Sequence, residues 1–271
     1  MTTLLEPSTG LTDAWDEVAA ELSAIPLAPE CVRYAAAIRP IAALPRSARI
    51  LEAGCGAGRI LRALDGLEFA NLTGVEISAS RLEYVATAGP TGAKLVCSDE
   101  LPFEDGAFDA VVSAAVVEHV VDPRQWLREL ARVTRPGGLI SIATDTYIWH
   151  WLKLLGLYKS VQPLDCAIWP ATLARWGRQA GLELVECGGF VNVPDQRWYF
   201  LKQLRRLISW RRWWFKLTGI RTGRPRLAID YPPGDEVPDI LAATEKFHPT
   251  SARNFAQCIW SYECYYWFRK K

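Results

Sequence analysis

The 271-residue sequence lacks the features typical of membrane-spanning, zinc-binding and disulfide-rich proteins. It contains no run of about 18 apolar residues, which a membrane-spanning helix requires, and its first ten residues do not resemble an export signal. We therefore expect a protein that neither spans a membrane nor is exported by a classical signal. The cysteines are odd in number and none are spaced as C-x-x-C, which disfavours a zinc site and a closed disulfide framework. We therefore expect a metal-free protein of the reducing cytoplasm, with free cysteines at positions 31, 55, 97, 166, 187, 258 and 264.

The composition indicates a large globular domain. Hydrophobic residues make up 50% of the chain and charged residues 23%, which excludes a disordered or collagen-like protein. The length fits one large domain with an insertion, or one domain plus a small cap, because single domains average roughly 150 residues. The net charge of +1 conceals a local excess of base: residues 202–226 hold nine Lys or Arg and no acid, so the rest of the chain is net acidic.

Residues 49–145 predict an alternation of strands and helices. Apolar runs predict strands at 49–53, 71–77, 93–97, 108–117 and 139–144. We expect helices at 59–64, at 78–88 with Ser78 or Ser80 as N-cap, and at 122–134, the last opened by Asp122-Pro123 and ended by the Arg-Pro-Gly-Gly of 135–138. Strands joined by helices of this length form right-handed βαβ units, whose ligands lie at the carboxyl ends of the strands.

The later segments complete the predicted fold. A helix at 170–180 and strands at 182–190 and 259–268 give an α/β, Rossmann-like open sheet of seven mostly parallel strands with helices on both faces. We expect a single domain in four parts: a helical lead-in of residues 1–45 over the sheet edge, a core of 46–190, a basic and aromatic insertion or lid of 191–254, and a final strand within 255–271. The lead-in has helical patches at 13–24 and 29–38.

A glycine-rich turn follows the first strand. Gly54, Gly56 and Gly58 allow sharp bends and a close approach of the main chain to a ligand, and the next helix offers free N–H groups to a carboxylate or phosphate. Glu76 ends the second strand, 20 residues past Gly56, the separation at which an acid accepts hydrogen bonds from both hydroxyls of a ribose. The turn therefore predicts a nucleoside-containing ligand.

The glycine spacing distinguishes two such ligands. Dinucleotide sites prefer G-x-G-x-x-G, whereas this turn has the spacing G-x-G-x-G, with Glu52 two residues before its first glycine. The pattern favours S-adenosylmethionine over NAD.

Five blocks of sequence together resemble the class I S-adenosylmethionine-dependent methyltransferases, and most closely their small-molecule and lipid-type branch. The resemblance covers roughly residues 45–190, and its blocks lie at 51–59, 75–78, 101–103 with 108–112, 117–120 and 135–138. It implies that Glu52 and the main chain at Gly54 and Gly56, within a turn completed by Gly58, hold the methionine end of the cofactor. It further implies that Glu76 binds the ribose, that Asp99 or Glu100 accepts from the adenine amino group, and that Ile77 and Leu101 lie against the adenine ring.

His119 is the candidate catalytic residue. Methyl transfer requires the acceptor to be held about 3 Å from an activated methyl group in a dry pocket, and it needs no metal. An oxygen acceptor benefits from a general base, and His119 lies just past the fourth strand. The alternative is that His119 only orders its loop, while Glu118 has a structural or cofactor-adjacent role.

Residues 198–217 combine tryptophan, leucine and base. At helical spacing their Trp, Phe and Leu side chains fall on one side and most Lys and Arg on the other, as in helices that lie at an anionic membrane surface. The same pattern suits a lid over the active site, or, with less support, RNA binding through stacking and phosphate contacts.

We therefore expect a cytoplasmic enzyme, peripheral to the inner leaflet, that moves a methyl group from S-adenosylmethionine to an oxygen of a small-molecule, lipid or lipid-linked acceptor. A nucleobase acceptor is disfavoured because Ser-Ala-Ala-Val-Val stands at 113–117 where such enzymes carry an Asn or Asp with two prolines. The alternatives are an RNA or protein methyltransferase, or a non-catalytic module that binds S-adenosylmethionine.

Overall fold

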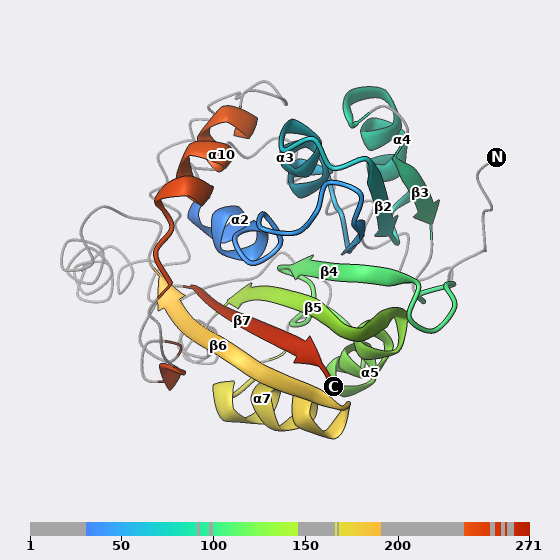
Figure 1. Ribbon diagram of the computed structural model, residues 1–271. Coiled ribbons are helices and arrows are strands. Elements are labelled where there is room, and N and C mark those ends of the chain that lie inside the picture. The colour runs from blue at the N-terminus through green and yellow to red at the C-terminus, as the bar shows by residue number, and fades with distance from the viewer. Residues whose placement is uncertain are drawn as a thin grey trace, which may run out of the picture.

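The computed structural model describes residues 31–90, 93–97, 100–145, 166, 168–190, 236–249, 253–255, 258 and 263–271. Strands and helices alternate along the described chain, except that the fourth strand follows the third with no described helix between them (Figure 1). The strands are β1 Arg49–Ala53, β2 Asn71–Glu76, β3 Lys94–Cys97, β4 Phe108–Ala114, β5 Thr134–Asp145, β6 Leu182–Phe190 and β7 Glu263–Lys270. The helices are α2 Cys31–Ile38, α3 Arg59–Gly66, α4 Ala79–Ala88, α5 Pro123–Val133, α7 Pro170–Gln179 and α10 Glu236–Lys246.

The seven strands form one open sheet in the order β3-β2-β1-β4-β5-β7-β6. The first five are parallel, and β7 runs antiparallel to both β5 and β6. The predicted fold class is thus confirmed. The strand order reverses between β1 and β4, so the carboxyl ends of these two strands flank the crevice where ligands bind in open α/β sheets.

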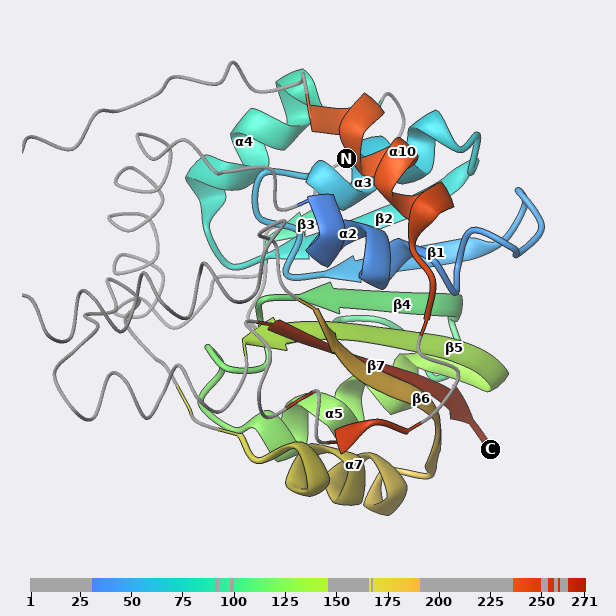
Figure 2. The ribbon, with the colours of Figure 1, turned by 90° about the vertical axis from the view of Figure 1, so that its left-hand side faces the viewer.

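Helices cover both faces of the sheet (Figure 2). Alternate side chains of each strand point to opposite faces. Leu51 and Val111 pack in the core on the side of α5 and α7, while Ile50 and Val112 pack on the side of α2, α3 and α10. Burial on both faces explains why these strands are continuously apolar in sequence.

Two helix starts agree with the capping signals. The hydroxyl of Ser78 accepts a hydrogen bond from the N–H of Arg81, which makes Ser78 the N-cap of α4. The carboxylate of Asp122 accepts from the N–H groups of Arg124 and Gln125 and so caps α5. Each cap pairs main-chain donors that have no partner within the helix.

The fifth strand begins earlier than predicted. β5 starts at Thr134 rather than at Leu139, and residues 135–138, expected only to end the preceding helix, lie inside the strand as a bulge opposite Asp109. Gly137 has a φ of +75°, a backbone conformation that glycine adopts at little cost. The Arg-Pro-Gly-Gly sequence therefore both ends the helix and bends the start of the strand.

The first described helix, α2, lies over the middle of the sheet. The sequence had led us to expect it over the sheet edge. α2 packs against β4, β5 and β7, and the indole Nε1–H of Trp267 donates to the carbonyl of Ala36 at 2.9 Å. The reason is that β7 turns Tyr265 and Trp267 toward this face, and α2 buries them together with Phe247.

Part of the expected insertion belongs to the same helical layer. α10 packs against α2 and α3, a position that the sequence did not predict. The expected helix at 13–24 and residues 191–235, which include the basic and aromatic segment, lie outside the described residues. Among the residues that are described, no helix has the length and apolar character needed to cross a membrane.

Candidate functional site

The glycine turn joins the end of β1 to the start of α3. The N–H groups of Gly54 and Cys55 both donate to the carbonyl of Val75 at 2.8 Å, which ties the turn to β2. Gly54 has a φ of +82°, and a Cβ atom there would lie 2.3 Å from Cγ2 of Val116. Both the backbone conformation and the packing therefore require glycine at position 54.

The next glycine of the turn has open space on its side-chain face. Gly56 has a φ of +50°, and a Cβ atom there would meet no atom closer than Nη1 of Arg81 at 4.0 Å. Its N–H donates to Oε2 of Glu76 at 2.8 Å. The main chain at Gly56 can thus be approached closely, as a cradle for a small ligand requires. Gly58, with a φ of +70°, precedes α3 and packs against Val85.

Glu52 supplies a buried carboxylate beneath the turn. It is 4% exposed, and its Oε2 accepts a hydrogen bond from the N–H of Leu61 in α3 at 3.0 Å. Burial raises the pKa of Glu52 well above its ordinary value, against the opposing effects of the Leu61 N–H and the Arg62 guanidinium. A cationic group bound beside Glu52 would favour the ionised carboxylate.

Glu76 connects the loops that follow β1 and β2. It is 5% exposed; its Oε2 accepts from Gly56, and its Oε1 accepts from the N–H groups of Ile77 and Ser78 at 3.0 and 3.1 Å. The two acids predicted to bind the cofactor, Glu52 and Glu76, therefore lie at the carboxyl ends of adjacent strands, on the same side of the sheet as α3.

The predicted adenine-side residues are only partly described. Ile77 is half-buried at the end of β2, Glu100 is exposed, and Leu101 is 2% exposed within the core that includes α5. Asp99 lies outside the described residues. The choice between Asp99 and Glu100 as acceptor of the adenine amino group therefore stays open.

His119 follows β4 beside a buried acid. The imidazole is 10% exposed, and its Nε2 lies 3.9 Å from Oε1 of Glu118. Glu118 is 1% exposed; its Oε1 accepts from the N–H of Asp145 at 3.3 Å, and no described residue donates a hydrogen bond to its Oε2. The predicted catalytic residue thus lies between the ends of β4 and β5.

Sequence reasoning missed an ionic group next to this position. Arg33 of α2 forms ion pairs with Asp145, at the end of β5, and with Glu263, at the start of β7. Glu263 is fully buried, and an acid within an otherwise aromatic strand was the available signal. No group of three or more His, Cys, Asp or Glu side chains among the described residues is placed to hold a metal ion.

Comparison with known proteins identifies the family of this chain. The family described as "Methyltransferase domain" matches residues 51–142. A "Ubiquinone biosynthesis O-methyltransferase" of Xanthomonas axonopodis is 30% identical over 165 residues, which cover 55% of this chain and 69% of the relative. A protein of the same name from Thiobacillus denitrificans is 30% identical over 57% of this chain and 72% of the relative. This chain belongs to the class I S-adenosylmethionine-dependent methyltransferases.

Solved structures support the same fold for this methyltransferase. A Haloferax volcanii protein, solved in complex with the Trm112 methyltransferase activator, aligns with 96% of this chain and 97% of its own length at a TM-score of 0.59 and 19% identity. An S-adenosylmethionine-dependent methyltransferase from Mesorhizobium loti aligns with 87% of this chain and 98% of its own length at a TM-score of 0.52 and 17% identity.

The described residues of this methyltransferase fit its cofactor. S-adenosylmethionine carries an ammonium and a carboxylate at one end and a ribose in the middle. The site offers a buried carboxylate at Glu52, an approachable main chain at Gly56 and a second buried carboxylate at Glu76. The predicted cofactor is thus confirmed by the family and is compatible with the chemistry of these groups.

The raised pKa of Glu52 predicts a specific pH dependence of stability. The native carboxyl holds its proton more tightly than the unfolded chain does, so its stabilising contribution is fully present below the unfolded pKa of 4.5 and is lost as the pH rises through the native pKa. Each unit of difference is worth about 1.4 kcal/mol. Urea unfolding of the ligand-free enzyme should therefore show stability falling with pH relative to Glu52→Gln.

The exposed Glu83 of α4 offers a matched control, because Glu83→Gln makes the same chemical change at the surface. Its free energy of unfolding should follow that of the wild type across the pH range. Parallel pH profiles for the wild type and Glu52→Gln would contradict the prediction.

Proposed function

We propose that this methyltransferase transfers the methyl group of S-adenosylmethionine to a hydroxyl oxygen of a small, lipid-like aromatic acceptor. The cofactor half of the proposal depends on one observation, the pairing of the Glu76 carboxylate with the main chain of the glycine turn. The acceptor half is supported by the curated relatives, which are named ubiquinone biosynthesis O-methyltransferases. Ubiquinone is a ring compound with a lipid tail, so the acceptor class combines an aromatic hydroxyl with apolar surface.

The cofactor would be held by groups at the ends of the first three strands. Glu52 would pair with the ammonium group. The N–H groups of Gly54 and Gly56 already donate to Val75 and Glu76, so these glycines would hold the methionine end by letting it lie close against the main chain of the turn. Glu76 would accept from the ribose hydroxyls. Ile77 and Leu101 would lie against the adenine ring, Leu101 being almost fully buried in this ligand-free structure. Asp99 or Glu100 would accept from the adenine amino group.

His119 would remove the proton of the acceptor hydroxyl. The sulfonium of the bound cofactor supplies an activated methyl group, so the protein needs to orient the acceptor and take up one proton. Oε1 of Glu118 lies 3.9 Å from Nε2 and would help to keep the ring oriented toward the acceptor. The alternative role of His119 is to order the loop, whose main-chain N–H at position 119 donates to the carbonyl of Val116 at 2.7 Å.

The proposed activity can be tested with methyl-labelled S-adenosylmethionine. A hydroxylated benzene ring that bears an isoprenoid chain should be methylated at oxygen, the same ring without the chain should react more slowly, and total RNA and total protein should acquire no label. Label in RNA or in protein would instead support one of the alternative acceptors. Binding of S-adenosylhomocysteine without methylation of any acceptor, total lipid extract included, would indicate a non-catalytic module.

His119→Gln should lower kcat about 10²-fold or more if the imidazole is the general base, because general bases typically contribute 10²- to 10⁴-fold. The KM for S-adenosylmethionine should be unchanged. The kcat of the variant should rise toward that of the wild type as the pH approaches the pKa of the acceptor hydroxyl, because an ionised acceptor no longer needs a general base. An unchanged kcat with lowered thermal stability would instead assign His119 to loop order. His248, an exposed histidine that follows α10, provides the control His248→Gln.

We propose further that this enzyme reaches its acceptor at the cytoplasmic face of a membrane. The proposal depends on the sequence pattern of residues 198–217 alone, which lie outside the described residues. Each Lys or Arg near an anionic surface contributes about 1 kcal/mol to binding. The basic residues of this segment therefore suit an anionic inner leaflet.

Cosedimentation with liposomes that contain phosphatidylserine should be extensive at low salt and weak at high salt. The triple variant Arg205→Gln/Arg206→Gln/Arg212→Gln should bind at least about tenfold more weakly, because it removes three such contributions. The triple variant Arg39→Gln/Arg124→Gln/Arg128→Gln makes the same charge change at exposed positions elsewhere and should bind like the wild type. Equal binding by both variants would reject residues 198–217 as the membrane contact and leave the lid as the better interpretation.

A further inference from the structure

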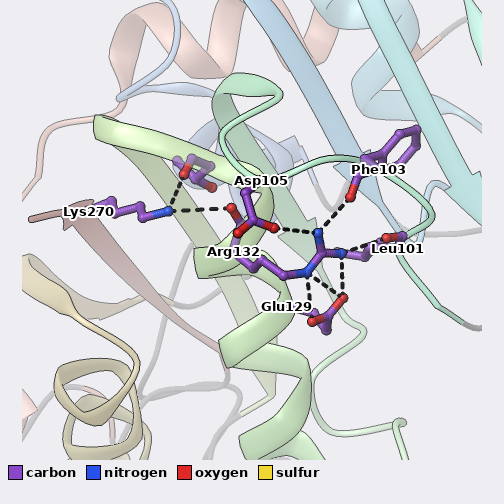
Figure 3. Close-up of polar contacts among 7 residues, drawn as sticks. Leu101, Phe103, Asp105, Glu129, Arg132 and Lys270 are labelled. Atoms are coloured by element: carbon purple, nitrogen blue, oxygen red, sulfur yellow. Dashed lines mark hydrogen bonds and ion pairs between the residues drawn. The ribbon is translucent and has the colours of Figure 1, made fainter.

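Arg132, in the last turn of α5, holds the loop that follows the expected adenine-binding residues (Figure 3). Its Nη2 donates to the carbonyl of Leu101 at 2.8 Å, and its Nη1 donates to the carbonyl of Phe103 at 2.6 Å. Both acceptors are main-chain atoms. The guanidinium therefore restrains the path of the backbone and not merely the position of one side chain.

The main chain of Arg132 holds the other end of the same loop. Its carbonyl accepts from the N–H of Gly106 at 2.9 Å, and Lys270, near the end of β7, donates to the carbonyls of Arg132 and Thr134 at 3.4 and 2.7 Å. Residues 101–106 are thus attached to α5 through one residue, which is itself anchored to β7.

Two carboxylates keep the guanidinium in place. Glu129, one turn earlier in α5, accepts from Nε and Nη2 of Arg132, and Asp105 accepts from Nη1 at 3.0 Å. These acids, Glu129 foremost, raise the pKa of Arg132. Because Asp105 is 80% exposed and Glu129 is 25% exposed, the two ion pairs orient the arginine more than they stabilise the fold.

The loop between these attachments is packed, so a change in one part moves the rest. Leu101 is 2% exposed, its carbonyl also accepts from the N–H of Phe103 at 2.8 Å, and the ring of Phe103 meets Phe108 of β4 edge to face at 4.9 Å. A shift of the carbonyls at 101 and 103 would therefore displace the backbone at Glu100 directly.

We propose that Arg132 is a positioning residue for the cofactor. It touches none of the reacting groups, but it sets the main chain from Leu101 to Gly106 and, through it, the adjoining residues that receive the adenine ring. The proposal rests on the proposed assignment of Asp99 or Glu100 to the adenine amino group. Arg132 thereby affects the affinity and the base preference of the site, and not the chemical step.

The test is calorimetric titration of the whole enzyme with S-adenosylhomocysteine. In Arg132→Met the Kd should rise about tenfold or more, since a hydrogen bond to a charged group is worth roughly a tenfold change in an equilibrium constant. At saturating S-adenosylmethionine kcat should stay within about twofold of the wild type, and so should the KM for the acceptor. Arg128→Met is the matched control, because Arg128 lies one turn earlier on α5 and its side chain is exposed.

A second ligand separates positioning of adenine from general destabilisation. S-inosylhomocysteine has an oxo group in place of the adenine amino group, so its Kd relative to that of S-adenosylhomocysteine measures how well the site recognises the base. In Arg132→Met this preference should fall together with the affinity, whereas a general weakening of the fold would raise both Kd values equally. Arg132→Lys keeps the charge but replaces the forked guanidinium with a single ammonium nitrogen. Its affinity for S-adenosylhomocysteine and its preference for adenine should both fall, but less than in Arg132→Met.

An unchanged Kd in the folded Arg132→Met variant, or an equal rise for both ligands, would overturn the proposal. If Arg132→Met does not fold, Arg132→Lys decides by the same two ratios. Failure of the wild type to bind S-adenosylhomocysteine would contradict the proposed function itself. Binding by the wild type without preference between the two ligands would overturn the adenine assignment and this inference with it.

Discussion

The carboxylate of Glu76 holds the loops after β1 and β2 in one arrangement, and the cofactor site is built on that arrangement. One of its oxygens accepts from Gly56, and the other accepts from Ile77 and Ser78. A buried N–H group without a partner costs about 1 to 3 kcal/mol of folding free energy, so the Glu76 carboxylate stabilises the two loops even when no ligand is bound. Glu52 does the same for the start of α3. Both acids thus organise the turn, and we propose that they also bind the cofactor.

The site has a cofactor side and an acceptor side, and they are stabilised differently. On the cofactor side, Arg132 attaches the loop beyond β3 to α5 through main-chain carbonyls. On the proposed acceptor side, Glu118, which follows β4, accepts from the main-chain N–H of Asp145 at the end of β5. The side chain of Asp145 pairs with Arg33 of α2. Hydrogen bonds to main chain suit a loop that must keep one shape, and Glu118 lies beside His119, the residue that we propose takes up a proton.

Much of the fold and of the cofactor site could be predicted because the signals are local. Apolar runs and caps such as Asp122 are local signals, and the structure agrees with them. Gly56 and Glu76, 20 residues apart, also meet in the structure, while their binding of the cofactor stays a prediction. The start of β5 was predicted wrongly because a Pro-Gly-Gly sequence ends a helix and also permits a bulge. The position of α2 was predicted wrongly because the surface that it covers is formed by β7, at the far end of the chain.

The amino-acid sequence by itself determined the order of strands and helices, the glycine turn and the two acids that accompany it, since each depends on residues close together in the chain. Only the tertiary structure decided what lies around them. Arg33 meets Asp145 across 112 positions, and the loop carbonyls of Leu101 and Phe103 meet the side chain of Arg132. Such pairs leave no periodic trace in the sequence, because the geometry that joins them exists only after the sheet has assembled and brought distant segments to the same edge.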